Sequence, residues 1–217
     1  MPERSRAGRG FFSTSSEKLA RALLGTVLVR VLDDGTRLAG MIVETEAYCG
    51  VKDRGSHAYG GRRSQRNESM YGPPGTSYVY FTYGMHYCMN IVCGAAGDPL
   101  AVLLRALEPL EGIDFMREAR GPRSSGRPHP DTDLCSGPGK LCQALRIDRA
   151  QDGLDMVTSR TLFLEITPQG TAPRKIQRTA RIGLGSAGTW TYKPLRWHFR
   201  GHGHVSRARI PRPPGDV

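Results

Sequence analysis

Two acidic residues, Glu44 and Glu46, stand two positions apart in the segment MIVETEAY, residues 41–48. The neighbouring residues are mostly apolar and β-branched, which is typical of a β-strand. Side chains at positions i and i+2 of a strand point to the same face, so this spacing puts the carboxylates together. A carboxylate that faces a cleft can act as a general base. The pattern by itself nevertheless favours two solvent-facing acids.

Two further segments combine ring, amide and cationic side chains. One is the Gly-rich basic stretch HAYGGRRSQRN at 57–67, and the other is the aromatic stretch SYVYFTYGMHYCMNIVC at 77–93. Tyrosines of this kind either stack on a flat ligand or fill a core or sheet face, and the pattern leaves both readings open. The side chains of chemical interest are His57, Arg62, Tyr80, Tyr83 and Asn90.

Several short patterns suggest other chemistry but lack the required context. The glycines at 183–188 (GLGSAG) match a dinucleotide fingerprint, yet no helix-forming segment follows and the only later acid is Asp216. Lys140 lacks the earlier glycine of a Walker loop; at a helix start it either holds one phosphate or is simply solvated. No metal site is expected, because the clustered histidines lack Cys or carboxylate partners. These histidines are His198, His202 and His204.

The first elements follow from capping and periodicity. Thr14 and Glu17 have the spacing of a capping box before a helix-favouring segment, and Gly25 predicts the end of that helix. Residues 26–32 alternate as a strand, which a short turn joins to a returning strand over 37–48.

Later segments continue this mixture of strands and helices. Residues 77–93 predict a hairpin with its turn at Tyr83-Gly84, which leaves Tyr83 at the tip. Residues 100–107 predict a strand, and Pro109 predicts the start of a helix. The remaining predictions are a polar loop over 120–133, a helix after the turn at 136–139, and strands near 156–166 and 195–200. Because strands and helices do not alternate regularly, we predict an α+β fold.

Composition limits the class of protein and its partners. The 217 residues fit one domain, and the net charge of +11 favours a polyanionic partner, either nucleic acid or an anionic membrane surface. No apolar run approaches the ~18 residues of a membrane span, and no secretory signal is recognisable. The five cysteines form no C-x-x-C pair, which favours reduced thiols. We therefore expect an intracellular protein without a membrane partner, with flexible tails at 1–10 and 207–217.

A series of motifs resembles the alkyladenine (3-methyladenine) DNA glycosylase family, the alkylpurine DNA N-glycosylases. The motifs are, in order, IVETEAY, H-x-x-GGR-x-x-x-RN, PGT-x-YVY-x-x-YGM-x-x-CMN, LLRALEPLEG, LCSGPGKLCQAL and ARIGLG-x-AG-x-W. The likeness covers residues 11–206, which we take as the glycosylase domain. It implies a single mixed domain with a curved antiparallel β-sheet flanked by helices, which needs no metal or organic cofactor. We expect a monomer, because one glycosylase site needs only one chain.

The resemblance also assigns roles to individual positions. It implies that Glu46 is the general base that activates water and that Arg105 lies beside this water. It implies that Tyr48 and His57 stack on one face of a flipped base and Tyr80 on the other, while Tyr83 intercalates into the DNA. The other positions that it implies are Asn90 and Ile182 in the base pocket, with Lys140 and Arg62 as candidate phosphate contacts.

The resemblance implies a monofunctional DNA glycosylase that flips a damaged purine from duplex DNA and hydrolyses its N-glycosidic bond in base excision repair. The substrates would be 3-methyladenine, 7-methylguanine, hypoxanthine and etheno-adenine. The protein would act at the nucleoid of a bacterial cytoplasm or in a eukaryotic nucleus. Two alternatives stay open, a non-catalytic protein that binds damaged DNA and an enzyme or binding protein that acts on RNA.

Overall fold

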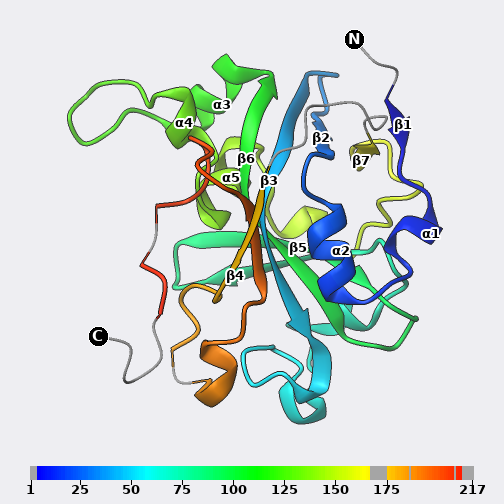
Figure 1. Ribbon diagram of the computed structural model, residues 1–217. Coiled ribbons are helices and arrows are strands. Elements are labelled where there is room, and N and C mark those ends of the chain that lie inside the picture. Colours follow the sequence, from blue (N-terminus) through cyan, green and yellow to red (C-terminus); the bar gives the residue numbers. More distant parts are fainter. Residues whose placement is uncertain (1–3, 167–174, 186, 208, 212–217) are drawn as a thin grey trace.

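The computed structural model describes residues 4–166, 175–185, 187–207 and 209–211 (Figure 1). Its strands are β1 (Ser5–Arg6), β2 (Val27–Val31), β3 (Arg37–Cys49), β4 (Ser77–Thr82), β5 (His86–Cys93), β6 (Leu100–Glu111), β7 (Leu162–Ile166), β8 (Ile176–Thr179) and β9 (Arg196–Phe199). Its α-helices are α1 (Arg9–Phe12), α2 (Ser16–Ala22), α3 (Ile113–Arg120), α4 (Asp131–Leu134) and α5 (Pro138–Ala144). Short 3₁₀ turns cover Gly50–Lys52, Tyr59–Gly61, Glu68–Tyr71, Arg149–Gln151 and Gly188–Thr191.

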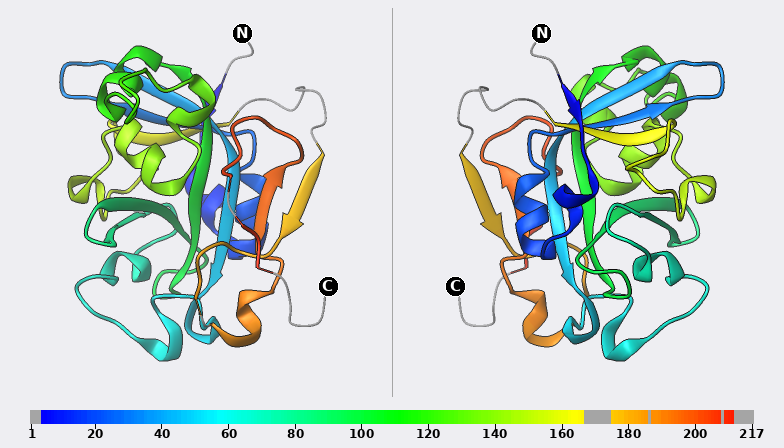
Figure 2. Two further views of the ribbon diagram at one scale, coloured as in Figure 1. Left: turned by 90° about the vertical axis from the view of Figure 1, so that its left-hand side faces the viewer. Right: turned by 90° about the vertical axis from the view of Figure 1, so that its right-hand side faces the viewer.

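One antiparallel sheet joins all the strands that lie in these described ranges. Their order is β1-β7-β2-β3-β6-β5-β4, and β9 pairs with both β3 and β8. The long strand β3 forms the centre, because its first residues pair with β2 while residues 44–46 pair with β9. Residues 90–93 of β5 pair with β6, whereas the outer part of the β4–β5 hairpin projects away from the central strands (Figures 1 and 2), so the sheet is curved. The α+β prediction is thereby confirmed.

An irregular register between β3 and β6 determines where one long side chain points. Ile42 pairs with Leu107, whereas Thr45 pairs with Leu104, and shifts in between leave Arg105 without a partner residue on β3. Such a β-bulge bends the strand and redirects the extra side chain. The bulge therefore turns Arg105 toward the acidic residues of β3.

Helices cover the central strands from two directions. Figure 2 shows α2 and α5 on either side of β3 and β6, and both helices pack on β6. Their buried apolar residues, among them Leu19 and Leu141, belong to the main hydrophobic core. The predicted capping box is wrong, because Ser15 is the N-cap of α2 and accepts a hydrogen bond from the Lys18 backbone N–H. The end at Gly25 is confirmed by its φ of 87° just after the helix.

The hairpin β4–β5 forms as predicted. Its turn residues Tyr83 and Gly84 have φ of 52° and 66°, the left-handed conformations that a tight hairpin turn requires. Glycine adopts this conformation without strain, and Tyr83 is 80% exposed at the tip.

The predicted helix start at Pro109 is wrong, because β6 continues to Glu111. Pro109 pairs with Gly40 beside a register shift, where a missing backbone N–H is tolerated. Helix α3 starts only after Gly112, whose φ is 73°. Helix α4, residues 131–134, begins near the end of the predicted loop at 120–133.

The remaining predictions were met in part. The strand near 195–200 corresponds to β9, whereas the one near 156–166 is confined to β7, and β8 was not predicted. Strand β1 and helix α1 begin inside the stretch predicted as the N-terminal tail. Residues 1–3, 208 and 212–217 of the two predicted tails lie outside the described residues.

Two further observations bear on the expected class of protein. All five cysteines are free thiols in the structure. None of the helices in the described part of the chain is long and apolar enough to cross a membrane.

Candidate active site

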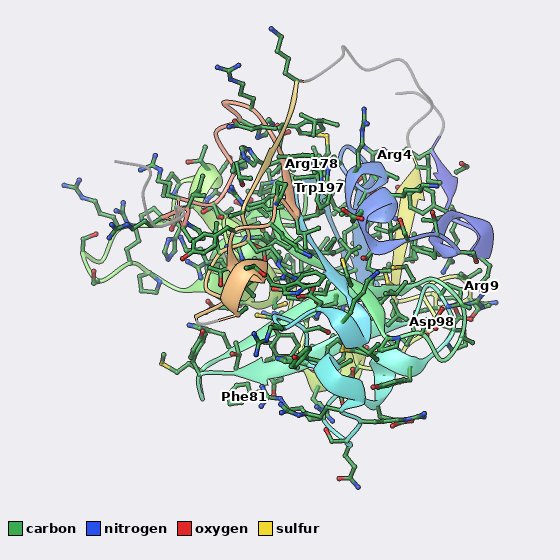
Figure 3. All side chains as sticks on the ribbon, turned by 60° about the horizontal axis from the view of Figure 1, so that its bottom comes forward. Arg4, Arg9, Phe81, Asp98, Arg178 and Trp197 are labelled. Atoms are coloured by element: carbon green, nitrogen blue, oxygen red, sulfur yellow. The ribbon has the colours of Figure 1, made fainter. Side chains whose placement is uncertain are left out.

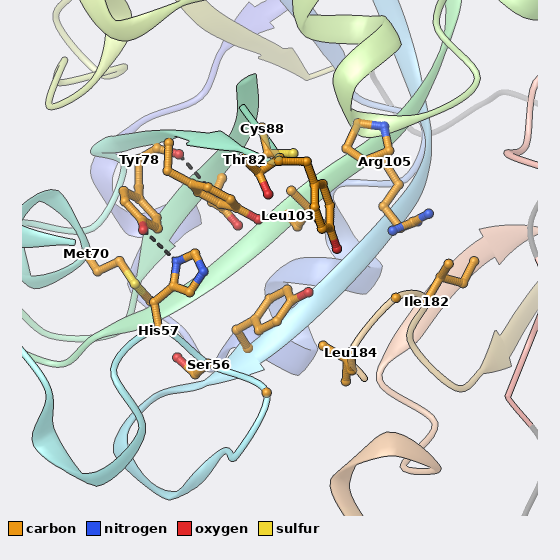
Figure 4. A pocket seen from close by; sticks show the side chains of 17 residues that line it. Ser56, His57, Met70, Tyr78, Thr82, Cys88, Leu103, Arg105, Ile182 and Leu184 are labelled. Carbon is orange, nitrogen blue, oxygen red and sulfur yellow. Dashed lines mark hydrogen bonds between the residues drawn. The ribbon is translucent and has the colours of Figure 1, made fainter. Parts of the chain in front are cut away.

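A cavity of about 350 Å³ opens between the β4–β5 hairpin and the central strands (Figure 4). This volume is within the range of small-molecule sites. Its walls are the end of β3, the loop after it, the hairpin, β6, the start of α5 and the segment before the last 3₁₀ turn. The lining residues used below are Tyr48, His57, Tyr78, Tyr80, Tyr83, Cys88, Asn90, Arg105 and Ile182.

Glu46 lies directly behind the wall of this cavity and is 0% exposed. The backbone N–H of Ile182 donates to its Oε1 at 2.8 Å, and the Tyr48 hydroxyl donates to its Oε2 at 3.1 Å. Arg105 Nη1 lies 3.2 Å from Oε1. All three partners line the cavity. The carboxylate is therefore held in a fixed orientation one side chain from the open space.

Glu44, which shares the strand face with Glu46, is also 0% exposed. Its Oε1 accepts from Arg105 Nε at 2.8 Å and from Arg196 Nε at 2.6 Å. Burial raises the pKa of Glu44, but the two guanidinium groups outweigh burial, so this pKa lies below its ordinary value. The solvent-facing arrangement favoured by the sequence pattern is wrong, because β9 and the C-terminal segment cover this strand.

Tyr48 has a cation on one face of its ring. The guanidinium of Arg181 lies 4.6 Å from the ring centroid and is held by Asp53 through contacts of 2.6 and 2.7 Å. Asp53 and Arg181 are both 0% exposed. Burial and then the charge of Glu46 raise the pKa of the Tyr48 hydroxyl well above 10.0, so it keeps the proton that it donates.

An aromatic cluster forms another wall. His57 Nδ1 and the Tyr78 hydroxyl are joined by a 2.7 Å hydrogen bond (Figure 4), and the His57 ring meets Tyr80 edge-on at 4.6 Å. His57 and Tyr80 therefore belong to one wall, which differs from the expected pairing of His57 with Tyr48. Burial, and then Arg66 and Arg62, lower the pKa of His57 below 6.5, so its imidazole is neutral at physiological pH.

Asn90 and Tyr83 occupy the hairpin on this side of the cavity. Asn90 is 4% exposed, and its Nδ2 donates to the Tyr78 carbonyl at 3.1 Å. This bond fixes the amide on the inner surface of β5. Tyr83 lines the rim but remains exposed at the turn.

The two candidate phosphate contacts lie outside this cavity lining. Lys140 pairs with Asp133, which also binds His129 Nδ1 at 2.6 Å. Arg62 is exposed, and its carbonyl accepts from Asn67 Nδ2 at 2.9 Å. Within the described ranges, no group of three or more His, Cys, Asp or Glu side chains is arranged to hold a metal ion.

Comparison with known proteins identifies the family. The methylpurine-DNA glycosylase family model matches residues 10–203. This chain belongs to that family. It is 50% identical to the DNA-3-methyladenine glycosylase of Mus musculus over 205 residues, and 48% identical to the protein of the same name from Homo sapiens. These alignments cover 93% of this chain but only 61% and 68% of the mouse and human proteins. A Burkholderia cenocepacia relative is 44% identical, with 94% of this chain and 92% of that protein covered.

In this member of the methylpurine-DNA glycosylase family, several residues of the site were not predicted from the sequence. Tyr78 shares a strand face with Tyr80, so period-two alternation could have found it. Asp53 and Arg181 pair across 128 positions and carry no local signal. The Arg178 guanidinium lies 4.8 Å from the centroid of the Trp197 ring, and Figure 3 shows the two side chains next to each other. Both belong to the β8–β9 pair, which also contains Arg196.

Proposed function

We propose that this chain is a monofunctional DNA glycosylase that removes alkylated or deaminated purines from duplex DNA by hydrolysis. The observation that carries the proposal is the buried Glu46 carboxylate, oriented by Tyr48 and Ile182 immediately behind an aromatic cavity. Family membership supports a glycosylase, and the net charge of +11 suits a DNA partner.

The damaged base would enter the cavity and be held by stacking. Extrusion from the duplex costs a few kcal/mol, and each base–aromatic stack contributes roughly 1–3 kcal/mol. The base would lie between Tyr48 and the wall formed by His57 and Tyr80. Tyr83, at the exposed hairpin tip, would fill the space left in the duplex and resist return of the base.

Glu46 would then act as the general base. A water at the corner where Tyr48, Arg105 and Ile182 meet would give its proton to Glu46 while its oxygen bonds to C1′ of the sugar. The glycosidic C1′–N bond breaks, and its electron pair leaves with the purine. The carboxylate also stabilises the positive charge that develops on the sugar.

The state of the purine decides whether a further proton is needed. A cationic base such as 3-methyladenine or 7-methylguanine leaves as a neutral purine. A neutral base such as hypoxanthine must first be protonated on its ring. Asn90 would discriminate against guanine, because its fixed amide opposes the exocyclic amino group. 7-Methylguanine carries the same amino group, but its cationic ring makes it a better leaving group, so excision would tolerate the poorer fit. The residues that line the described cavity include no lysine, so we propose hydrolysis without a Schiff base and without strand cleavage.

The test uses 5′-labelled duplexes that hold one hypoxanthine, one 7-methylguanine or no lesion. The proposal predicts that the lesion strands break only after alkali, which reveals abasic sites, and that the undamaged strand stays intact. Breakage without alkali would contradict a monofunctional enzyme. Tight binding to the lesion duplexes with no abasic sites would leave a damaged-DNA-binding protein. A preference for single-stranded RNA would contradict the duplex DNA partner.

A further inference from the structure

Glu44 is a buried carboxylate that the reaction above does not use. Its Oε1 accepts from Arg105, from Arg196 and, at 2.8 Å, from the Ser206 hydroxyl, while its Oε2 accepts from the Ser206 backbone N–H at 2.7 Å. It does not line the cavity. A buried charge must be paired, and here β6, β9 and the C-terminal segment all supply donors to one residue of β3.

Arg105 connects this carboxylate to Glu46. Its Nε lies 2.8 Å from Glu44, and its Nη1 lies 3.2 Å from Glu46. The guanidinium is a rigid fork, so a shift toward one carboxylate is a shift away from the other. A cation that moves closer to Glu46 stabilises its charged form and weakens it as a base.

The charges around both carboxylates are balanced as they stand. Glu46 faces Tyr48, Cys88, Arg105 and Arg181, and Glu44 faces Arg105, Arg196 and His198. The two glutamates match Arg105 and Arg196, while Arg181 is matched by Asp53. Loss of the Glu44 charge would leave one excess positive charge beside Glu46.

We propose that Glu44 is a positioning residue for the glycosylase reaction, which holds the Nε edge of Arg105 so that Glu46 keeps its basicity. Ser206 sets the strength of this hold, because its two donors compete with Arg105 for the same carboxylate. The inference rests on the proposed function and adds to it a role for the C-terminal segment. Removal of Glu44 or of the Ser206 hydroxyl changes the basicity of Glu46 in opposite directions.

The test is the pH dependence of single-turnover excision from a 7-methylguanine duplex. This lesion is already cationic, so the acid limb of the profile reports the general base alone. In Glu44→Gln, we expect the acid limb to move to lower pH by about one unit and the plateau rate to fall by at most about tenfold. In Ser206→Ala, Glu44 holds Arg105 more tightly, and the acid limb moves to higher pH by about half a unit.

The matched control is Glu165→Gln. Glu165 also faces two arginines, with Arg37 at 2.8 Å and Arg4 at 3.6 Å, but it belongs to β7 and lies outside the cavity lining. The acid limb of the Glu165→Gln variant should lie at the same pH as that of the unchanged protein. Any effect shared by this control is a general effect of removing a paired carboxylate.

Acid limbs that shift in opposite directions in Glu44→Gln and Ser206→Ala support the inference. A general loosening of the structure around Arg105 would shift the acid limbs of both variants in the same direction. Unshifted limbs, or shifts of equal sign, overturn it while the proposed function stands. If Glu44→Gln fails to fold by circular dichroism, Ser206→Ala decides, and an unshifted or lowered limb overturns the inference. An unchanged protein that excises no lesion overturns the proposed function and the inference with it.

Discussion

The site behind Tyr48 and the tip of the β4–β5 hairpin differ in how their side chains are held. Behind Tyr48, Glu44, Glu46 and Arg181 are 0% exposed, and each has several partners from distant parts of the chain. At the tip, Tyr83 and Met85 are 80% and 70% exposed, and the turn there is set by the left-handed backbone of Tyr83 and Gly84. The proposed function accordingly assigns the chemistry to the interior and the contact with DNA to the tip.

This difference predicts that interior substitutions change stability or reaction rate, whereas tip substitutions change the retention of DNA. An interior variant that mainly weakens DNA binding, or a tip variant that mainly lowers stability, would contradict this distinction.

The largest expected effect on stability is that of Arg181→Met. It leaves the Asp53 carboxylate buried without its cation, and removal of one partner of a buried pair costs about 3–5 kcal/mol. Chemical denaturation would measure this loss. The matched control is Arg178→Met. The Arg178 side chain is half exposed, and its Nη2 lies 3.6 Å from Glu17, so this substitution should lower the stability by less than about 1 kcal/mol. Equal losses in the two variants would contradict the distinction between interior and surface.

Tyr83→Ala should weaken DNA retention more than folding. Loss of a wedge side chain removes the stacking that keeps the base out, which is worth roughly 1–3 kcal/mol or about 5- to 150-fold in affinity. Binding to a duplex that holds an abasic-site analogue would measure it, with Phe81→Ala, on the same hairpin and 45% exposed, for comparison. The account is contradicted if melting temperature falls while affinity stays the same.

Gly84→Ala should have a smaller effect, confined to the hairpin. The φ of 66° at Gly84 disfavours any residue with a Cβ, and the cost is about 1 kcal/mol. A melting curve measures the loss of stability, and the affinity for duplex DNA shows whether the altered hairpin tip still binds DNA. Gly35→Ala, at a φ of 83° in another exposed turn, is the control, and it should lower stability without lowering DNA affinity.

The smallest effect concerns the pH dependence of stability through His57. Because its pKa in the folded protein lies below 6.5, mainly through burial, the unfolded chain binds a proton more readily. The resulting loss of folding stability is absent well above pH 6.5 and grows as the pH falls below that value. His57→Gln should therefore flatten the fall in melting temperature below pH 6.5. A slope as steep as that of the unchanged protein would show that other groups cause it.

Local patterns predicted the parts of the fold that depend on neighbours in sequence. The Tyr83-Gly84 turn and the strand predicted over 37–48, which the structure extends to Cys49, are such parts. A proline after an apolar segment locally favours a helix start, so the sequence predicted a helix at Pro109. Its actual place in β6 depends on pairing with Gly40, which is distant in sequence. The family resemblance was confirmed, yet the roles of the site residues stay predictions.

The buried ionic groups show most clearly where sequence reasoning ends. The alternation of Glu44 and Glu46 places both on one face, but it does not reveal that β9 and Ser206 cover that face. Likewise, the bulge that directs Arg105 arises from the register of two strands and has no signal in either one. Burial and charge pairing across the chain require the tertiary structure.

The most direct test of the account compares Glu46→Gln with Tyr83→Ala on one hypoxanthine duplex, measuring both the single-turnover excision rate and the dissociation constant. For Glu46→Gln, the account predicts a rate loss of about 10²- to 10⁴-fold, typical of a missing general base, with the dissociation constant nearly unchanged. For Tyr83→Ala, it predicts weaker binding as the main change. Excision at an undiminished rate by Glu46→Gln would contradict the central claim.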